Sequence, residues 1–332
     1  MAQIRMAQYG TKHGHAGGKF MAMQSNAEVE VVGVFEPDAE RRRQVEAEGP
    51  FQGAHFFADK GELLQDDGIV AIASEGGNAE SLDQTEEIVA AGKHVWYDKP
   101  AGDDWAQWQR VVARAQEQEL LIQMGYMFRY HDGFQQIARW ARSGMLGDIF
   151  AVRAHMSTSV GPESVQFISR NHRGGIFYDL SGHMLDQVVW LLGRPGKVSS
   201  FLRSDSGLGP EAMDNNLGVF EYDNAMAFVD IAAMETAPTA RRFEVYGNRG
   251  SAIMEPLEPA TRIRLCLKEA QEGYAAGEQF VPLRVQTRQQ LYEEELVAFL
   301  ATIRGEQAPD RSVDHELAVQ ETVLRGTGVL RD

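Results

Sequence analysis

The chain has 332 residues and a formal net charge of −16, with 43% hydrophobic and 24% charged residues. This mix is typical of a globular protein long enough for two domains, each with a sizeable core. The negative charge repels phosphate backbones and acidic lipid surfaces, so we expect neither nucleic acid nor a membrane as partner. No apolar run approaches the ~18–20 residues of a membrane span.

Cysteine use and the first residues both bear on location. The single cysteine, Cys266, cannot form an internal disulfide, which suits a reducing compartment. The segment Met1–Gly10 has no basic run followed by an apolar stretch, so we expect no secretory leader. Both features predict a cytoplasmic protein.

The first third of the chain alternates short apolar runs with helix-like stretches. The expected strands are Ile4–Tyr9, Glu30–Phe35, Ile69–Ala73, His94–Tyr97 and Leu120–Met124. The expected helices are Gly18–Gln24, Asp38–Ala47, Glu80–Ala91 and Trp105–Gln118. Such alternation predicts an α/β domain with a parallel sheet covered on both faces.

After Gly125 the pattern changes, because strands begin to follow one another directly. We expect helices at Phe134–Ser143, Tyr178–Leu192, Thr287–Arg304 and Val313–Leu330, and a loop at Ser159–Gly175. The expected strands are Asp148–Ser157, Lys197–Arg203, Asn216–Tyr222, Ala225–Met234, Arg241–Tyr246 and Arg262–Lys268. Strands in series predict a mostly antiparallel sheet. We therefore expect domains at residues 1–123 and 124–332.

A glycine-rich turn follows the first expected strand. Gly10, Gly14 and Gly17 are spaced G-x-x-x-G-x-x-G, one residue longer than the dinucleotide-binding fingerprint G-x-G-x-x-G. Glycines here let backbone N–H groups approach a pyrophosphate at a helix N-terminus. The alternative is an ordinary strand-to-helix turn. We take the turn as a cofactor loop, with Lys12, His13 and His15 among its cofactor-binding residues.

An acidic residue closes the second expected strand. Glu36 stands where a carboxylate accepts hydrogen bonds from the ribose hydroxyls of a dinucleotide. It would repel a 2′-phosphate, so it favours NAD over NADP. Three arginines, at positions 41 to 43, could instead meet a phosphate, although they also suit the solvated face of a helix.

Two histidines in the glycine turn, His13 and His15, raise the question of a metal. Two histidines in one loop do not form a site without further ligands, so we predict no metal.

Lys99 follows the fourth expected strand, directly before Pro100. Ligands of doubly wound sheets bind beyond the carboxyl ends of the strands, so Lys99 is expected to face the cofactor. The alternative is a surface lysine in a strand-to-helix loop.

A second group of polar residues lies on the helix expected at Tyr178–Leu192. Asp179, His183 and Asp186 have the i, i+4 and i, i+3 spacing of one helical face. Oxidation of a secondary alcohol needs a base for the hydroxyl proton, and histidine titrates near neutral pH. A lysine cation would stabilise the charge that develops on the substrate oxygen. The alternative is a buried histidine satisfied by a neighbouring acid.

Several segments together resemble the glucose–fructose oxidoreductase, inositol dehydrogenase and MocA family. They are Gly92–Val95, Asp98–Pro100, Gly125–Arg129, Ser143–Asp148, the helix with Asp179 and His183, and Arg242–Gly250. The resemblance covers nearly the whole chain. The chain differs from the family pattern in its glycine spacing, in Asp98 where the family usually has Glu, and in the stretch Ser74–Asn78.

The resemblance implies an N-terminal Rossmann fold and a C-terminal α+β domain with an open, mostly antiparallel sheet. It implies NAD(P)-dependent hydride transfer to or from a CH–OH group of a sugar, polyol or related small molecule, by a homodimer or homotetramer. Lys99, Asp179 and His183 would be catalytic, with His183 as acid/base. Ser74, Asn78 and Asp98 would line the cofactor, and Tyr126, Arg129, His172 and Tyr178 are candidate substrate contacts.

Two other interpretations stay open. Proteins of this architecture can bind a dinucleotide and regulate without turnover. A metal-dependent lyase or isomerase would instead use His155, His172, Asp179 and His183.

Overall fold

The computed structural model describes residues 2–47 and 49–331. The chain divides into two compact units. The first comprises residues 1–127 together with 288–316, and the second comprises residues 128–287 together with 317–332. The segment 288–316 therefore packs with a part of the chain more than 150 residues away, an association that no local pattern in the sequence displays.

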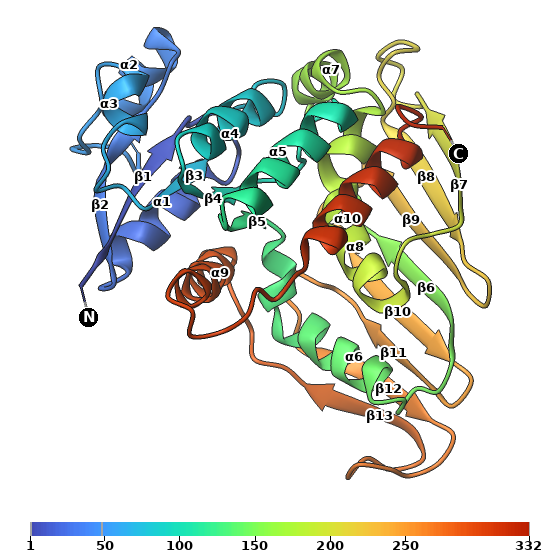
Figure 1. The fold of residues 1–332 in the computed structure, drawn as a ribbon. Coiled ribbons are helices and arrows are strands. Elements are labelled where there is room, and N and C mark those ends of the chain that lie inside the picture. Colours follow the sequence, from blue (N-terminus) through green and yellow to red (C-terminus); the bar gives the residue numbers. More distant parts are fainter. Residues whose placement is uncertain (1, 48, 332) are drawn as a thin grey trace. The chain divides into compact units, whose positions relative to one another are not determined.

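The first unit is built on a five-stranded parallel sheet, drawn in blue to cyan-green in Figure 1. Its strands are β1 (Ile4–Tyr9), β2 (Val29–Phe35), β3 (Ala71–Ser74), β4 (His94–Tyr97) and β5 (Ile122–Met124). The order is β2-β1-β3-β4-β5. A parallel bridge between Val34 and Phe56 adds a minimal strand beside β2 and completes the doubly wound order. The predicted Rossmann fold is confirmed.

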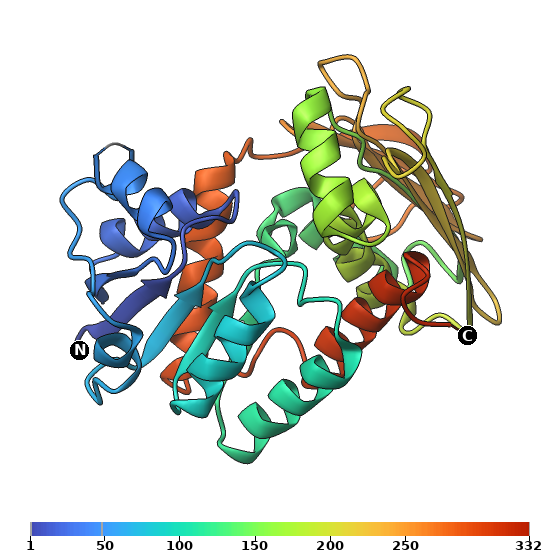
Figure 2. The same cartoon turned by 90° about the horizontal axis from the view of Figure 1, so that it is seen from above.

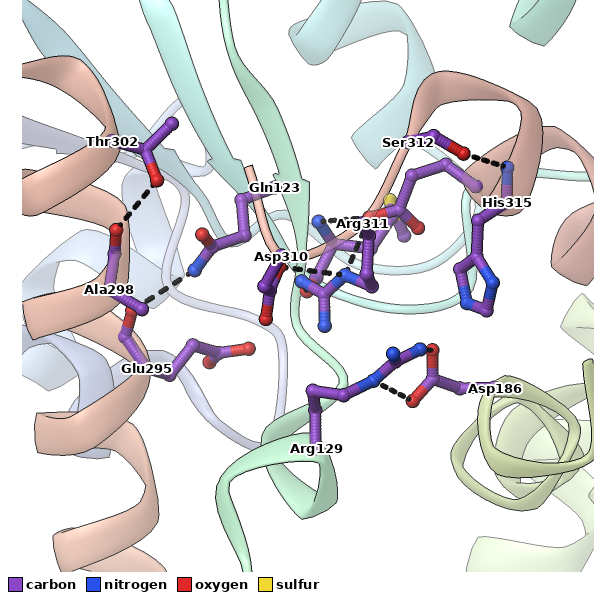
Figure 3. Close-up of polar contacts among 12 residues, drawn as sticks. Gln123, Arg129, Asp186, Glu295, Ala298, Thr302, Asp310, Arg311, Ser312 and His315 are labelled. Atoms are coloured by element: carbon purple, nitrogen blue, oxygen red, sulfur yellow. Dashed lines mark hydrogen bonds and ion pairs between the residues drawn. The ribbon is translucent and has the colours of Figure 1, made fainter. Parts of the chain in front are cut away.

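Helices cover both faces of this sheet (Figure 2). The helices of the first unit are α1 (Ala16–Ser25), α2 (Ala39–Ala47), α3 (Lys60–Leu64), α4 (Ser81–Ala90), α5 (Trp105–Glu117) and α9 (Arg288–Ile303). α1 and α9 pack closely, because Gly18 leaves no room for a side chain: a Cβ there would lie 2.5 Å from the Tyr292 ring. The amide of Gln123 donates to the carbonyl of Glu295 and ties β5 to α9 (Figure 3).

The second unit contains an eight-stranded sheet of order β13-β12-β11-β10-β6-β9-β8-β7. The strands are β6 (Ile149–His155), β7 (Lys197–Arg203), β8 (Asn215–Glu221), β9 (Met226–Ala232), β10 (Arg242–Gly247), β11 (Gly250–Met254), β12 (Arg262–Leu267) and β13 (Gly277–Pro282). All neighbours are antiparallel except β6 and β9. The predicted open, mostly antiparallel sheet is confirmed.

Helices of the second unit lie against one face of its sheet. They are the 3-10 turn η1 (Met127–Tyr130), which begins at the boundary between the units, then α6 (Asp132–Arg142), α7 (Pro162–Asn171) and α8 (Gly175–Leu192). α10 (Val313–Gly326) begins in the first unit and ends in the second. α8 packs against β8, β9, α6 and α7 and is buried along most of its length.

Several expected elements differ from the structure. The loop expected at Ser159–Gly175 contains α7, whose start at Pro162 is a favoured first helical position. The strands β11 and β13 and the short helix α3 were not predicted from the sequence. Only two residues separate β11 from the end of β10, so β11 does not stand out as a separate strand. β13 is a largely exposed strand at the edge of the sheet and lacks a clear apolar pattern.

Candidate functional site

The glycine loop between β1 and α1 has the properties of a dinucleotide cradle. Gly10 has φ of +85°, and a Cβ there would lie 2.6 Å from the backbone nitrogen of Gly76, so glycine is required. A Cβ on Gly14 would meet nothing within 4 Å, which leaves open space beside the loop. The first turn of α1 has no acidic residue and His15 makes no side-chain cap, so its N–H groups and positive dipole end suit a phosphate.

Glu36 lies at the end of β2 against this loop and is 3% exposed. Its carboxylate accepts hydrogen bonds from the backbone N–H and hydroxyl of Thr11, at 2.8 and 2.7 Å, and from the backbone N–H of Asp38. Arg41 approaches the same Thr11 and donates to its carbonyl and hydroxyl. The predicted ribose-binding acid therefore also fixes the glycine loop, and a cation stands close by.

A buried ion cluster lies below the glycine loop. The Nζ of Lys19, on α1, is 3.0 Å from Glu75 Oε1 and 3.1 Å from Asp98 Oδ2. These three side chains are between 0% and 2% exposed. Burial opposes the charge on Lys19, but the carboxylates outweigh it and raise the pKa of the lysine. Glu75 belongs to the stretch Ser74–Asn78 that departs from the family pattern, and its partner is an internal lysine.

His13 and His15 complete this cluster from the glycine loop itself. Nδ1 of His13 lies 3.3 Å and Nδ1 of His15 lies 3.0 Å from Oδ2 of Asp98. Burial disfavours a charged His13, yet Asp98 and Glu75 prevail and raise its pKa to about 9. Burial lowers the pKa of His15 to about 4. Burial likewise opposes ionisation of Asp98, but the two histidines and Lys19 hold its pKa well below the ordinary value.

Lys99 follows Asp98 at the carboxyl end of β4. Its backbone N–H donates to Asp98 Oδ1 at 2.7 Å, its side chain is buried and the bond to Pro100 is cis. Asp98 thus holds the backbone of Lys99 while it also contacts the histidine loop. The hydroxyl groups of Ser74 and of Thr85, on α4, form a hydrogen bond of 2.9 Å. Asn78 lies half-buried in the loop that follows β3.

The second polar group lies on α8 in the second unit. His183 is 3% exposed, with its ring edge-on to Phe128 at 5.1 Å, and Asp179 one turn earlier is half-buried. The two glycines before the helix have a packing role. Gly174 and Gly175 have φ of +84° and +53°, and a Cβ on either would collide with neighbouring atoms of the same unit.

Asp186 and Arg129 form a buried ion pair in the second unit (Figure 3). Arg129 Nε lies 3.1 Å from Asp186 Oδ2, and Nη2 contacts Oδ1. The guanidinium also stacks over Trp190 at 4.0 Å. Both side chains are at most 1% exposed, so this pair anchors η1 to α8.

The remaining candidates lie in three places. His172 stacks on Tyr178 with ring centroids 5.2 Å apart, at the start of α8. Tyr126, in the first unit, lies under the guanidinium of Arg311. His155 directs its two ring nitrogens to different acids, Nδ1 to Asp230 and Nε2 to Glu235. Among the described residues, His155, His172, Asp179 and His183 do not bring their ligand atoms together as a group, so the lyase interpretation gains no support.

Sequence reasoning missed two members of the first unit's cluster. Lys19 was not singled out, and Glu75 entered only as part of the stretch Ser74–Asn78 that departs from the family pattern. A lysine on the otherwise apolar face of α1, between the buried residues Ala16, Phe20 and Met23, is the signal that could have found it.

Comparison with known proteins identifies the family of the chain. Residues 4–126 match the model described as the oxidoreductase family, NAD-binding Rossmann fold, of the glucose–fructose oxidoreductase, inositol dehydrogenase and MocA family. Residues 134–253 match a C-terminal domain of that family. The chain belongs to this family of oxidoreductases, and its first unit is an NAD-binding Rossmann domain.

Individual relatives are distant. A myo-inositol 2-dehydrogenase of Thermotoga maritima is 20% identical over 76% of this chain and 75% of its own length. A scyllo-inositol 2-dehydrogenase (NAD(+)) of Bacillus subtilis is 26% identical over 60% of this chain. The alignment spans 59% of the length of that relative.

One solved structure shows the same fold over the whole chain. It is the UDP-N-acetylglucosamine 3-dehydrogenase of Acidithiobacillus ferrooxidans, with a TM-score of 0.78 at 20% identity, covering 99% of this chain and 98% of that one.

Proposed function

We propose that this protein is an NAD(P)-dependent dehydrogenase or reductase that acts on a secondary alcohol or ketone of a sugar, polyol or related compound. The observation that carries the proposal is the Rossmann unit with Lys99 held by Asp98 at the carboxyl end of β4. Ligands of such sheets bind at this edge. The inositol and nucleotide-sugar dehydrogenases among its relatives support the substrate class.

The catalytic roles fall on three side chains. His183 takes the hydroxyl proton during oxidation and returns it during reduction, a role that contributes typically ~10²–10⁴-fold. Lys99 stabilises negative charge on the substrate oxygen. Asp179, one turn before His183 on α8, orients the imidazole or the substrate. The nicotinamide accepts or donates the hydride.

The test is turnover measured by the absorbance of reduced nicotinamide, with NAD or NADP and a panel of sugars and polyols. His183→Asn should reduce kcat at least ~10²-fold while leaving NADH binding unchanged, because it removes only the proton acceptor. His315→Asn, on the first turn of α10, is the matched control and should keep full activity. NADH binding without turnover of any substrate in the wild type would oppose the proposal and favour the regulatory alternative.

NAD is the proposed cofactor, with Gly10, Gly14 and Gly17 at the pyrophosphate and Glu36 at the adenosine ribose. A carboxylate there accepts ribose hydroxyls and repels a 2′-phosphate. Glu36→Ala should weaken NADH binding far more than NADPH binding, measured by fluorescence titration. Glu40→Ala, on α2, is the control. Equal loss of both ligands would show that Glu36 serves only the loop through Thr11.

A homodimer or homotetramer is the proposed assembly. The face of the eight-stranded sheet opposite its buried core presents Phe201, Met226 and Phe280, each more than half exposed. Apolar area of this kind is typical of interaction surfaces. Phe201→Asp combined with Met226→Asp should yield a monomer, as measured by light scattering. A wild-type protein that is itself a monomer in this measurement would contradict the proposed assembly.

We place the protein in the cytoplasm, supported by its one free thiol, Cys266. Among the described residues, no helix is both long and apolar enough to cross a membrane.

A further inference from the structure

Three potential metal ligands converge in the first unit. One ring nitrogen of His13, one ring nitrogen of His15 and a carboxylate oxygen of Asp98 all lie within 4.8 Å of one another. Within residues 2–47 and 49–331, no other group of three or more histidine, cysteine or acidic side chains brings its ligand atoms together in this way. The sequence offered two histidines without a further ligand, and folding supplies it from β4, more than 80 residues away.

The distances from the Asp98 carboxylate to the two histidines fit a coordinated ion. Ligands at about 2.0–2.1 Å from a tetrahedral zinc ion stand about 3.3–3.4 Å apart. Here Asp98 Oδ2 is 3.0 Å from His15 Nδ1 and 3.3 Å from His13 Nδ1. A further carboxylate oxygen, Oε2 of Glu75, lies 3.6 Å from His13 Nδ1. Two imidazoles and one carboxylate form a three-ligand set that leaves a fourth position for Glu75, water or another ligand.

The charge around the three ligands also favours a cation. Asp98 and Glu75 are almost completely buried, and both face the single ammonium of Lys19. Both carboxylates also lie beside Nδ1 of His13, at 3.3 Å for Asp98 and 3.6 Å for Glu75, so their negative charge attracts a cation to this position. The histidine side chains are 7% and 12% exposed, so an ion could reach the site from the edge of the sheet while remaining largely desolvated.

From this arrangement we propose that His13, His15 and Asp98 bind a divalent transition-metal ion, zinc in preference to magnesium or calcium. Imidazole nitrogen suits zinc and its neighbours, whereas magnesium and calcium require oxygen ligands. The ion joins the β1–α1 loop to the end of β4. It acts at this junction as a structural clamp, independently of which substrate the protein uses.

The experiment titrates chelator-treated protein, free of dinucleotide, with Co²⁺ and records visible absorption. Four-coordinate Co²⁺ absorbs far more strongly there than the hydrated ion. We expect one equivalent of bound Co²⁺ with these bands, their loss on addition of Zn²⁺, and no effect of excess Mg²⁺. A second readout is the thermal midpoint, which should rise with Zn²⁺ because the ion binds the folded chain.

Four variants assign the site. His15→Asn and His13→Asn should abolish the bands and the thermal shift, with circular dichroism confirming that each variant folds. His55→Asn, a histidine of the same unit outside the cluster, should retain both. His155→Asn should also retain both, although His155 faces two acids. Absence of bands in the wild type, or bands that survive His15→Asn and His13→Asn, would overturn the proposal.

Discussion

The ammonium group of Lys19 lies 3.1 Å from Oδ2 of Asp98, and neither side chain is more than 2% exposed. The pair joins α1, which begins at the glycine loop, to the strand end that carries Lys99. It also shares its carboxylate with His13 and His15. A single buried contact therefore connects the helix of the glycine loop to the strand end that carries Lys99.

Removal of this lysine charge should be costly. Lys19→Met leaves Glu75 and Asp98 buried without the lysine cation, and breaking a buried pair in this way costs about 3–5 kcal/mol. We expect a loss of that order in the free energy of unfolding, measured with urea. Lys60→Met, which removes an exposed pair with Glu87, is the control and should cost about 0–1 kcal/mol. Comparable losses in both variants would mean that the buried pair is not important for stability.

The glycine loop offers a test that separates folding from binding. Gly14→Ala should leave the thermal midpoint unchanged, because a methyl group there meets nothing, yet it should weaken NADH binding by occupying the space beside the loop. Gly10→Ala should instead destabilise the fold by about 1–3 kcal/mol, since φ is +85° and Gly76 blocks the methyl group. Unchanged NADH affinity of Gly14→Ala would place the pyrophosphate elsewhere.

The Arg129–Asp186 pair gives a prediction for the second unit. Arg129→Met should destabilise the protein by about 3–5 kcal/mol, because Asp186 keeps a buried charge. Adding Asp186→Leu should recover much of that loss. If Arg129→Met instead raises KM while the thermal midpoint stays constant, Arg129 contacts substrate and the pair is dispensable for folding.

The buried carboxyl of Glu295, on α9, should make the free energy of unfolding depend on pH. Burial raises the pKa of its carboxyl to about 8 in the folded protein, against an ordinary value of 4.5. Between these two pH values the unfolded chain releases the proton and the folded chain keeps it, so this group lowers stability progressively as pH rises from 4.5 to 8.

Glu295→Gln should therefore stabilise the protein by an amount that grows over this window and is then constant, on the order of a few kcal/mol. Urea unfolding at pH 5, 7 and 9 measures it, with the exposed Glu306→Gln as control. A gain that does not change with pH would contradict the raised pKa.

Local sequence signals predicted most of the secondary structure. The strands Ile4–Tyr9, His94–Tyr97 and Lys197–Arg203 have the predicted bounds, because each ends directly before residues typical of turns. α7 escaped prediction because its segment is polar and follows Gly161, features shared with loops. The sequence indicated the C-terminal end of α8 clearly, at Gly193. It did not indicate the N-terminal end, because Gly174 and Gly175 resemble an ordinary turn.

The sequence by itself determined the alternation of strands and helices in the first third, the series of strands later, and the motifs that carry the family resemblance. Those features depend on neighbours along the chain. Only the tertiary structure decided that Lys19, Glu75 and Asp98 meet beneath His13 and His15. These residues lie on a helix and on loops that parallel strand packing brings together at one sheet edge. No spacing in the sequence records which loops will meet there, because the contact is made across strands and not along the chain.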